Sequence, residues 1–218
     1  MSMKQILFNT EMVRAILDGR KSCTRRIVKP QQLVGLLPAK CKNGVPEEFL
    51  KEKKFMFKPY CNMTDIELIN TAYKAPYQLG DILYVRETWC GLPVNEAGHF
   101  RGHPIYYYRA DGDLRPEGWR GAWHPSIHMP KEAARIWLKV TDVRVERLQE
   151  ITTNQIEQEG VETEYPHVLN GEEKKYAFQN LWNSTINKSN LDFYGWDANP
   201  WVWVIEFERC EKPESEGN

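Results

Sequence analysis

The strongest chemical signal in this sequence is a concentration of cations between residues 14 and 29. Six Lys or Arg side chains stand there against one Asp, a local charge of +5 in a chain whose formal net charge is −1. Such a cluster is typical of a surface that faces an anion. A solvated helix end is the alternative, because cations also offset the dipole at a helix C-terminus. The cations are Arg14, Arg20, Lys21, Arg25, Arg26 and Lys29, and the acid is Asp18.

Histidines and cysteines offer a second kind of chemistry, metal binding. Two pairs of histidines are each four residues apart, a spacing that chelates a metal on a helix, but neighbouring Gly and Pro residues favour loops. The five cysteines include no C-x-x-C pair and are expected to be reduced, with a zinc site built from three of them as the alternative. We therefore expect no metal and no other cofactor. The residues concerned are His99, His103, His124, His128, Cys41, Cys61 and Cys90.

Several aromatic residues lie beside arginines in polar segments. Proteins stack unpaired bases on aromatic faces in such surroundings, and packing at the mouth of a barrel is the alternative. Trp182, Trp201 and Trp203 are expected in the core instead. The residues of the polar segments are Trp89, Tyr107, Trp119 and Trp123.

The cationic cluster must be positioned by a strand and a helix that precede it. Gln5 to Phe8 predicts a short buried strand, Asn9 an N-cap, and Gly19 the end of the helix that follows. Residues 31–77 are rich in Pro and Lys, which indicates an excursion that carries a hairpin of its own.

The remainder of the chain alternates between strand patterns and two helices. No βαβ repetition occurs, which favours a mixed, closed or half-closed sheet of the α+β class. A capping box at Thr152 begins the first of these helices, which ends near Gly160. The predicted strands are 82–85, 105–108, 136–145 (with a bulge near Asp142) and 201–207, and the second helix is 174–186.

The composition sets limits on the class of protein. Hydrophobic residues make up 41% and charged residues 27%, which is typical of a soluble globular chain. No apolar run approaches the roughly 20 residues of a membrane span, and the N-terminus lacks a signal peptide's apolar stretch. We expect a cytoplasmic protein with no membrane partner, whose RNA site would be a local basic patch.

Four motifs in order resemble those of the ASCH family, in the PUA-like superfamily. The first, G-x-K-x-x-T-x-R, falls within residues 17–26, and the resemblance is closest to the longer ASCH proteins of phages and prophages. It implies a mixed PUA-like β-barrel with two or three short helices. One domain would span 1–210, with inserts at about 31–77 and 89–130, before a flexible acidic tail at 211–218. The motifs lie at Gly19, Lys21, Thr24 and Arg26, and at 80–89, 143–160 and 203–207.

The resemblance also implies a set of catalytic residues. Some small ASCH proteins are amidohydrolases that remove acetyl from N4-acetylcytidine, and their lysine, threonine and glutamate fall on Lys21, Thr24 and Glu159. Deacylation needs a nucleophile, a base and an acid for the leaving amine. Thr24 would attack, Lys21 would be the base if neighbouring arginines and burial lower its pKa, and Glu159 would serve the amine. Arg26 would stabilise an oxyanion or hold a phosphate.

The predicted partner is RNA or a modified nucleoside, and the predicted function is binding with amide hydrolysis on an N4-acylated cytidine. A non-catalytic RNA-binding module and a metal-dependent ribonuclease remain the alternatives. Glu87 would add a second acid, unless it only forms an ion pair with an arginine. The predicted binding residues are Arg20, Arg25, Arg26, Glu87 and Trp89.

Overall fold

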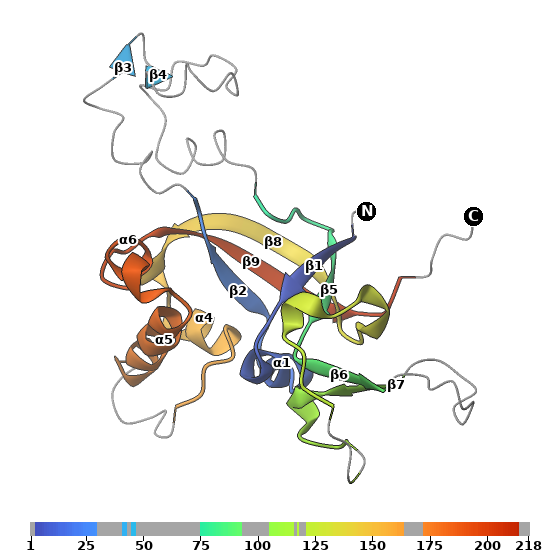
Figure 1. Ribbon diagram of the computed structural model, residues 1–218. Coiled ribbons are helices and arrows are strands. Elements are labelled where there is room, and N and C mark those ends of the chain that lie inside the picture. Colours follow the sequence, from blue (N-terminus) through green and yellow to red (C-terminus); the bar gives the residue numbers. More distant parts are fainter. Residues whose placement is uncertain are drawn as a thin grey trace.

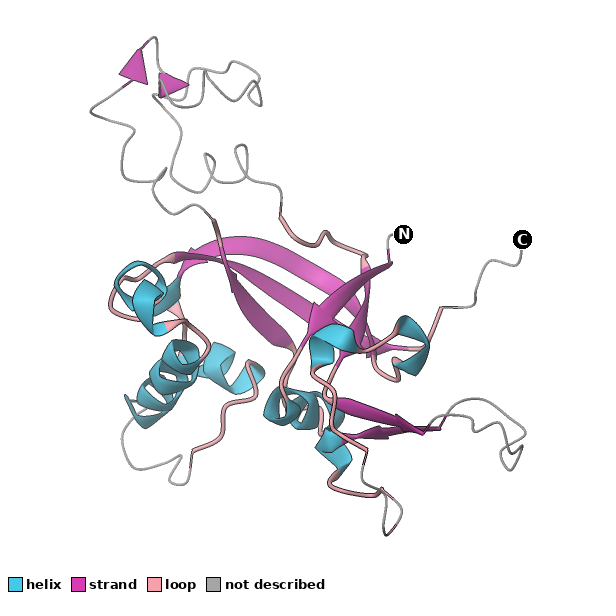
Figure 2. Cartoon of the chain, viewed as in Figure 1, coloured by secondary structure: helices cyan, strands magenta, loops and turns pink. Residues whose placement is uncertain are grey.

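Strands and short helices combine in a mixed α+β arrangement (Figures 1 and 2). The computed structural model describes residues 3–29, 75–92, 105–115, 117, 121–163 and 172–213, and for residues 41–42, 45–46 and 92 the backbone alone. The strands are β1 Met3–Leu7, β2 Cys23–Ile27, β3 Cys41–Lys42, β4 Val45–Pro46, β5 Ile82–Arg86, β6 Trp89–Leu92, β7 Ile105–Tyr108, β8 Trp137–Arg147 and β9 Trp201–Cys210. The α-helices are α1 Thr10–Leu17, α4 Thr153–Gln158, α5 Glu172–Ser184 and α6 Leu191–Tyr194. The 3-10 turns are η3 Arg109–Asp111, η4 Ser126–His128, η5 Lys131–Ala133, η6 Leu148–Glu150 and η7 Lys188–Asn190.

Five strands form the main sheet, in the order β1-β5-β8-β9-β2. The β1–β5 pair is parallel and the other three pairs are antiparallel. Figure 1 shows the long strands β8 and β9 arching above α1, α4 and α5. Two small two-stranded sheets, β3–β4 and β6–β7, accompany the main one.

The closed barrel predicted from the sequence is not present among the described strands. The edges of the main sheet are β1 and β2, and no ladder pairs one with the other in the described part of the chain. A side chain spans these edges instead: Arg26 donates from Nη2 to the carbonyl of Leu7 at 3.2 Å. The sheet is therefore open where the pocket described below begins.

Strand β9 is buried on both faces, which explains its nearly continuous apolar sequence. Trp201 and Trp203 pack into the larger core cluster with Ile205, whereas Val202 and Val204 pack on the other face under α4 and α5. The core positions predicted for Trp182, Trp201 and Trp203 are thus confirmed, with exposures of 7%, 6% and 5%.

Most predicted elements are confirmed. They include the long strand with its bulge, which lies between Val140 and Asp142, and the hairpin within 31–77, which is β3–β4. The region 89–130 is less irregular than expected, because β6 and β7 pair within it. In α5 the buried aromatic residues are Phe178 and Trp182, whereas Tyr176 is 65% exposed.

Helices α1 and α4 end in the same way, and both ends lead into the candidate site. In α1, the N–H of Gly19 bonds to the carbonyl of Ile16, and that of Arg20 to Ala15, at 3.1 and 2.8 Å. In α4, Gly160 and Val161 make the equivalent bonds to Glu157 and Ile156. This is the Schellman motif, which needs a left-handed residue, and both glycines have positive φ. The predicted helix ends at these glycines are confirmed.

Gly160→Ala is expected to destabilise the fold by about 2–4 kcal/mol, because φ is +79° and the new methyl would lie 2.6 Å from the Cβ of Ala15. Gly19→Ala is the matched control: φ is similar, at +75°, but no atom lies within 4 Å, so only the backbone strain of about 1 kcal/mol applies. Urea unfolding of both variants measures the difference. Equal losses would show that Gly160 does not hold α4 against α1.

Candidate functional site

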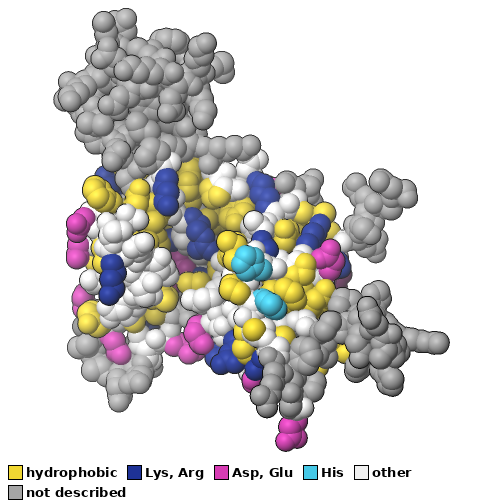
Figure 3. Space-filling view, in the orientation of Figure 1, with side chains coloured by type: hydrophobic (Ala, Val, Ile, Leu, Met, Phe, Trp, Pro, Cys, Tyr) yellow, Lys and Arg dark blue, Asp and Glu magenta, His cyan; other side chains and the backbone are white. Residues whose placement is uncertain are grey.

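A pocket of about 300 Å³ lies between α1, β2 and α5. Figure 3 shows Lys and Arg side chains spread among hydrophobic ones on this side of the molecule. One wall is polar, from β2 and the end of α4, and the opposite wall is apolar, from α5. The lining residues are Leu7, Asn9, Met12, Thr24, Arg25, Arg26, Glu159, Phe178, Leu181, Trp182 and Thr185.

Lys21 and Glu159, which are 138 residues apart in the chain, meet behind the polar wall. The backbones of these two residues form an isolated antiparallel bridge, and the N–H of Ser22 bonds to the carbonyl of Gln158 at 2.8 Å. The Lys21 ammonium, whose side chain is 0% exposed, donates to Glu159 Oε2 at 2.7 Å. Burial removes the competing water, so this ion pair is a fixed part of the structure.

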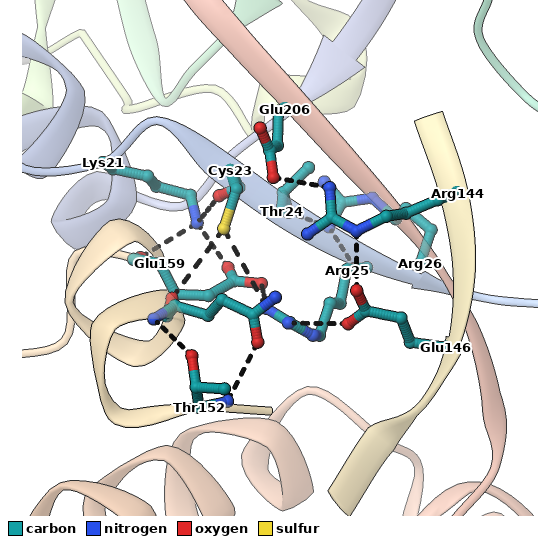
Figure 4. A network of polar contacts seen from close by, with 11 residues as sticks. Lys21, Cys23, Thr24, Arg25, Arg26, Arg144, Glu146, Thr152, Glu159 and Glu206 are labelled. Carbon is teal, nitrogen blue, oxygen red and sulfur yellow. Dashed lines mark hydrogen bonds and ion pairs between the residues drawn. The ribbon is translucent and has the colours of Figure 1, made fainter. Parts of the chain in front are cut away.

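Arg25 holds the other oxygen of the same carboxylate. Its Nη1 donates to Glu159 Oε1 at 3.1 Å, and its Nη2 donates to Glu146 Oε2 at 3.3 Å. Glu146 in turn accepts from Arg144, which also contacts Glu206 (Figure 4). Cations and carboxylates therefore alternate from Lys21 to Arg144. Glu159 is clamped on both sides and faces the pocket as an oriented hydrogen-bond acceptor.

Thr24 and Arg26 are neighbours on the pocket wall. Both residues line the pocket, and Arg26 Nη1 donates to the Thr24 hydroxyl oxygen at 2.8 Å. The hydroxyl proton of Thr24 is thereby left to donate to another group, because a hydroxyl that accepts a hydrogen bond still has its own proton. Because side chains alternate along a strand, Thr24 and Arg26 share one face of β2, which brings the two side chains together.

The hydrogen bonds of Lys21 do not match the predicted role of a base. Besides Glu159 Oε2, its Nζ contacts the carbonyl oxygens of Cys23 and Glu159 at 2.7 and 2.9 Å. Three acceptors require all three N–H bonds of an ammonium, and no lone pair remains to take a proton. Lys21 instead orients Glu159 in this arrangement. It is also absent from the residues that line the pocket.

Sequence reasoning missed Cys23, which lies between Lys21 and Arg25. Its thiol donates to the carbonyl of Gln155 at 3.8 Å, and burial, aided by Glu159, raises its pKa to about 12. At pH 8 roughly one Cys23 thiol in ten thousand is ionised. Because the thiolate is the nucleophile, Cys23 is a packing residue and not a catalytic one.

Cys23 is accordingly expected to resist iodoacetamide at pH 8 in the folded protein and to react fully in urea. Cys210, which is only partly buried, is the internal control and should be alkylated first. Mass spectrometry of the two peptides after timed quenching measures both rates. Rapid native labelling of Cys23 would show that the Lys21–Glu159 surroundings are open to solvent.

Three predicted binding residues lie away from this pocket. Arg20 forms ion pairs with Asp18 and Glu162, at 2.8 and 3.1 Å, and borders a different hollow. Glu87 and Trp89 follow β5 and do not line the pocket either. Their predicted place in the cleft is corrected here, because Glu87 pairs with Arg135 and Trp89 packs against Tyr106 and His124 instead.

Glu87 belongs to an ion-pair cluster of its own. Arg135 donates to its two carboxylate oxygens from Nε and Nη2, at 2.9 and 3.1 Å, and also binds Asp111. The pKa of Glu87 is raised by burial, an effect that Arg135 opposes. The guanidinium of Arg135 stacks 4.0 Å from the centre of the Tyr108 ring. This cluster links η3 and the residues before β8 to the end of β5. Glu87 is therefore the partner of an arginine in an ion pair, which was the alternative to a second acid in the cleft.

The described tryptophans beside the arginines contact other rings or the arginines themselves. Trp89 contacts the rings of Tyr106 and His124, with centroids 5.7 and 5.1 Å apart. Arg115 and Arg109 lie over the ring of Trp123, at 4.6 and 5.3 Å. Trp119 lies outside the described residues. The aromatic wall of the pocket is provided instead by Phe178 and Trp182 of α5. The sequence indicated Trp182 only as a core residue and gave no signal for Phe178.

Within the described ranges no group of three or more His, Cys, Asp or Glu side chains is placed to hold a metal ion. His99, His103 and Cys61, which entered the metal hypotheses, lie outside those ranges, as does the side chain of Cys41. Among the helices described, none has the length and apolar character to cross a bilayer.

Comparison with known proteins gives one structural match. No family model and no curated protein matches the chain. A solved ASCH domain from Lactobacillus crispatus JV V101 matches over 95% of this chain and 79% of its own, with 10% identity and a TM-score of 0.37. At this level of similarity the match carries no argument about function, and membership of the ASCH family remains a prediction from the sequence motifs.

Proposed function

We propose that the pocket between α1, β2 and α5 binds the base of a nucleoside or of an unpaired RNA nucleotide, in a protein of the ASCH type. The observation that carries the proposal is the convergence of Thr24, Arg25, Arg26 and Glu159 on one pocket whose opposite wall is aromatic. Its volume, about 300 Å³, lies at the lower end of the range for small-molecule sites. A single base with its sugar is a ligand of that class.

The polar wall offers both hydrogen-bond donors and hydrogen-bond acceptors. Glu159 is an acceptor held by two cations, which suits an N–H group of a base. Arg25 supplies donors, and its buried Nε–H has no hydrogen-bond partner in the described part of the chain. Cytosine presents the complementary N–H and carbonyl groups on one edge.

Amide hydrolysis is the second candidate, favoured by the position of the Thr24 hydroxyl. In this scheme Thr24 Oγ attacks the acyl carbon of an N4-acylcytosine, the C–N bond breaks, and water then releases the acyl group from the threonine. Arg26, 2.8 Å from Oγ, would stabilise the developing negative charge. Glu159 takes over the predicted task of Lys21 as base, since each carboxylate oxygen keeps a lone pair, and then returns the proton to the leaving amine.

Two assays on the purified full chain test these proposals. Calorimetric titration with cytidine, uridine, adenosine and guanosine measures base binding, and chromatography of N4-acetylcytidine after incubation measures hydrolysis. Thr24→Val is expected to abolish hydrolysis, whereas Thr141→Val, on the exposed part of β8, should not change it. Saturable cytidine binding without turnover would leave only the binding function. If neither the nucleosides nor their monophosphates bind, the base-binding proposal is wrong.

A further inference from the structure

We propose that the ligand of this pocket carries a phosphate group, which Arg26 binds, so that the substrate class is a nucleotide or an RNA residue and not a free nucleoside. This inference rests on the proposed function, because it assigns a second part of the ligand to the same pocket. It begins from the distribution of counter-ions around the polar wall.

Within the described residues Arg26 has no carboxylate partner, unlike the other cations of the polar wall. Lys21 and Arg25 both bind Glu159, and Arg25 also binds Glu146. Glu146 is paired with Arg144 as well, so the carboxylates of this network already have cationic partners. Every hydrogen bond of Arg26 to a described residue goes to a neutral oxygen, so its guanidinium has no direct counter-ion there.

The neutral contacts fix the guanidinium and still leave donors free. Arg26 donates to Thr24 Oγ1, to the carbonyl of Arg25 and to the carbonyl of Leu7, at 2.8, 3.0 and 3.2 Å. The ring of Phe8 lies on one side, with its centroid 5.5 Å away. These three bonds use three of the five N–H groups, and the remaining two suit the oxygens of a phosphate.

Placing this cation beside a pocket without a counter-ion is unfavourable for the free protein. Burial lowers the pKa of Arg26, because the charged form loses hydration. An anion at this position would restore the lost interaction, and a ligand that brought it would gain affinity from the same charge. The pocket wall is therefore preorganised for an anionic ligand.

The test compares cytidine with its 3′- and 5′-monophosphates by calorimetry, on the full chain and on two variants. For the wild type we expect at least one monophosphate to bind about tenfold more tightly than cytidine, since a charge-assisted contact is added. Arg26→Gln should bring the ratio of the two affinities close to one. Arg209→Gln, on the exposed end of β9, is the control and should keep the ratio.

A short oligocytidine distinguishes a nucleotide from RNA as the source of the phosphate. Tighter binding of the trinucleotide, with a dependence on Arg26, would assign a backbone phosphodiester, and tighter binding of a monophosphate would assign a terminal phosphate. Both outcomes support the inference. If Arg26→Gln does not fold by urea unfolding, Arg26→Lys replaces it, because it keeps the charge but loses the paired donors.

The outcomes separate this inference from the proposed function. Equal affinities of the wild type for cytidine and both monophosphates, or a ratio that survives Arg26→Gln, would overturn the phosphate contact while base binding stands. If no nucleoside or nucleotide binds, the base-binding proposal falls, and inorganic phosphate alone becomes the probe. Phosphorus NMR broadening that Arg26→Gln removes would then support the phosphate site, and its absence would refute it.

Discussion

Replacing Lys21 by Met is expected to lower the free energy of unfolding by about 3–5 kcal/mol, which is the effect typical of breaking a buried ion pair. The substitution leaves Glu159 without its closest cation. It also leaves the carbonyl of Cys23 without the donor that lies 2.7 Å away. Met keeps most of the side-chain volume, so the loss reports the polar contacts and not a cavity. Urea unfolding followed by tryptophan fluorescence measures it.

Lys139→Met is the matched control for this prediction. Lys139 is 45% exposed and lies 3.9 Å from Glu208, a surface pair that contributes at most about 1 kcal/mol. A double variant, Lys21→Met with Glu159→Leu, should recover part of the loss, because both buried charges are then removed. A loss below about 1 kcal/mol for Lys21→Met would mean that the buried pair is not formed in solution.

Glu159→Gln is expected to weaken cytidine binding about 100-fold, since the loss of one partner of a buried charged hydrogen bond typically amounts to 2–5 kcal/mol. The amide keeps the shape of the side chain but loses the charge that accepts from Lys21 and Arg25. Any hydrolysis of N4-acetylcytidine should fall by at least the same factor, because Glu159 is the proposed base. Calorimetry and the chromatographic assay measure the two effects.

Stability and function must be separated for this variant. Gln at position 159 also leaves two buried cations without a carboxylate, so the assays belong at a temperature where circular dichroism shows the variant folded. Glu208→Gln, on the exposed end of β9, is the control and should bind as the wild type does. A folded Glu159→Gln protein with unchanged affinity for cytidine would remove Glu159 from the base-binding wall.

Local signals in the sequence predicted most of the elements. The Asn9 cap and Gly19 end delimit α1, and the Thr152 capping box with Gly160 delimits α4. These signals work because they depend on hydrogen bonds within a few residues. They also place Lys21 and Glu159 close to helix ends. The prediction that these two residues meet therefore required only that the two helix ends lie side by side.

Other features depend on contacts that no local pattern encodes. The barrel was expected from the resemblance to ASCH proteins, since the strand pattern alone allowed a closed or a half-closed sheet. Closure depends on whether β1 and β2 approach within hydrogen-bonding distance, and the side chain of Arg26 lies there instead. Glu87 comes just after a predicted strand, a position from which a carboxylate often reaches a functional site. Its partner, Arg135, lies 48 residues further on and could be identified only from the fold.

The role of Lys21 illustrates the same limit. A lysine among arginines suggests a lowered pKa and a base, and this was the sequence hypothesis. The structure supplies three oxygen acceptors to its ammonium, two of them backbone carbonyls that no side-chain motif reveals. The sequence motif identified Lys21 as a site residue. Only its hydrogen bonds show that it orients Glu159 and does not accept a proton.

The central claim is that the wall formed by Thr24, Arg25, Arg26 and Glu159 receives a nucleobase. Methyl NMR of threonine-labelled protein during titration with cytidine monophosphate tests it most directly. Thr24 and Thr185, which both line the pocket, should shift together and saturate, while exposed Thr141 on β8 stays unchanged. Saturable shifts confined to other threonines, or none up to millimolar ligand, would contradict the claim.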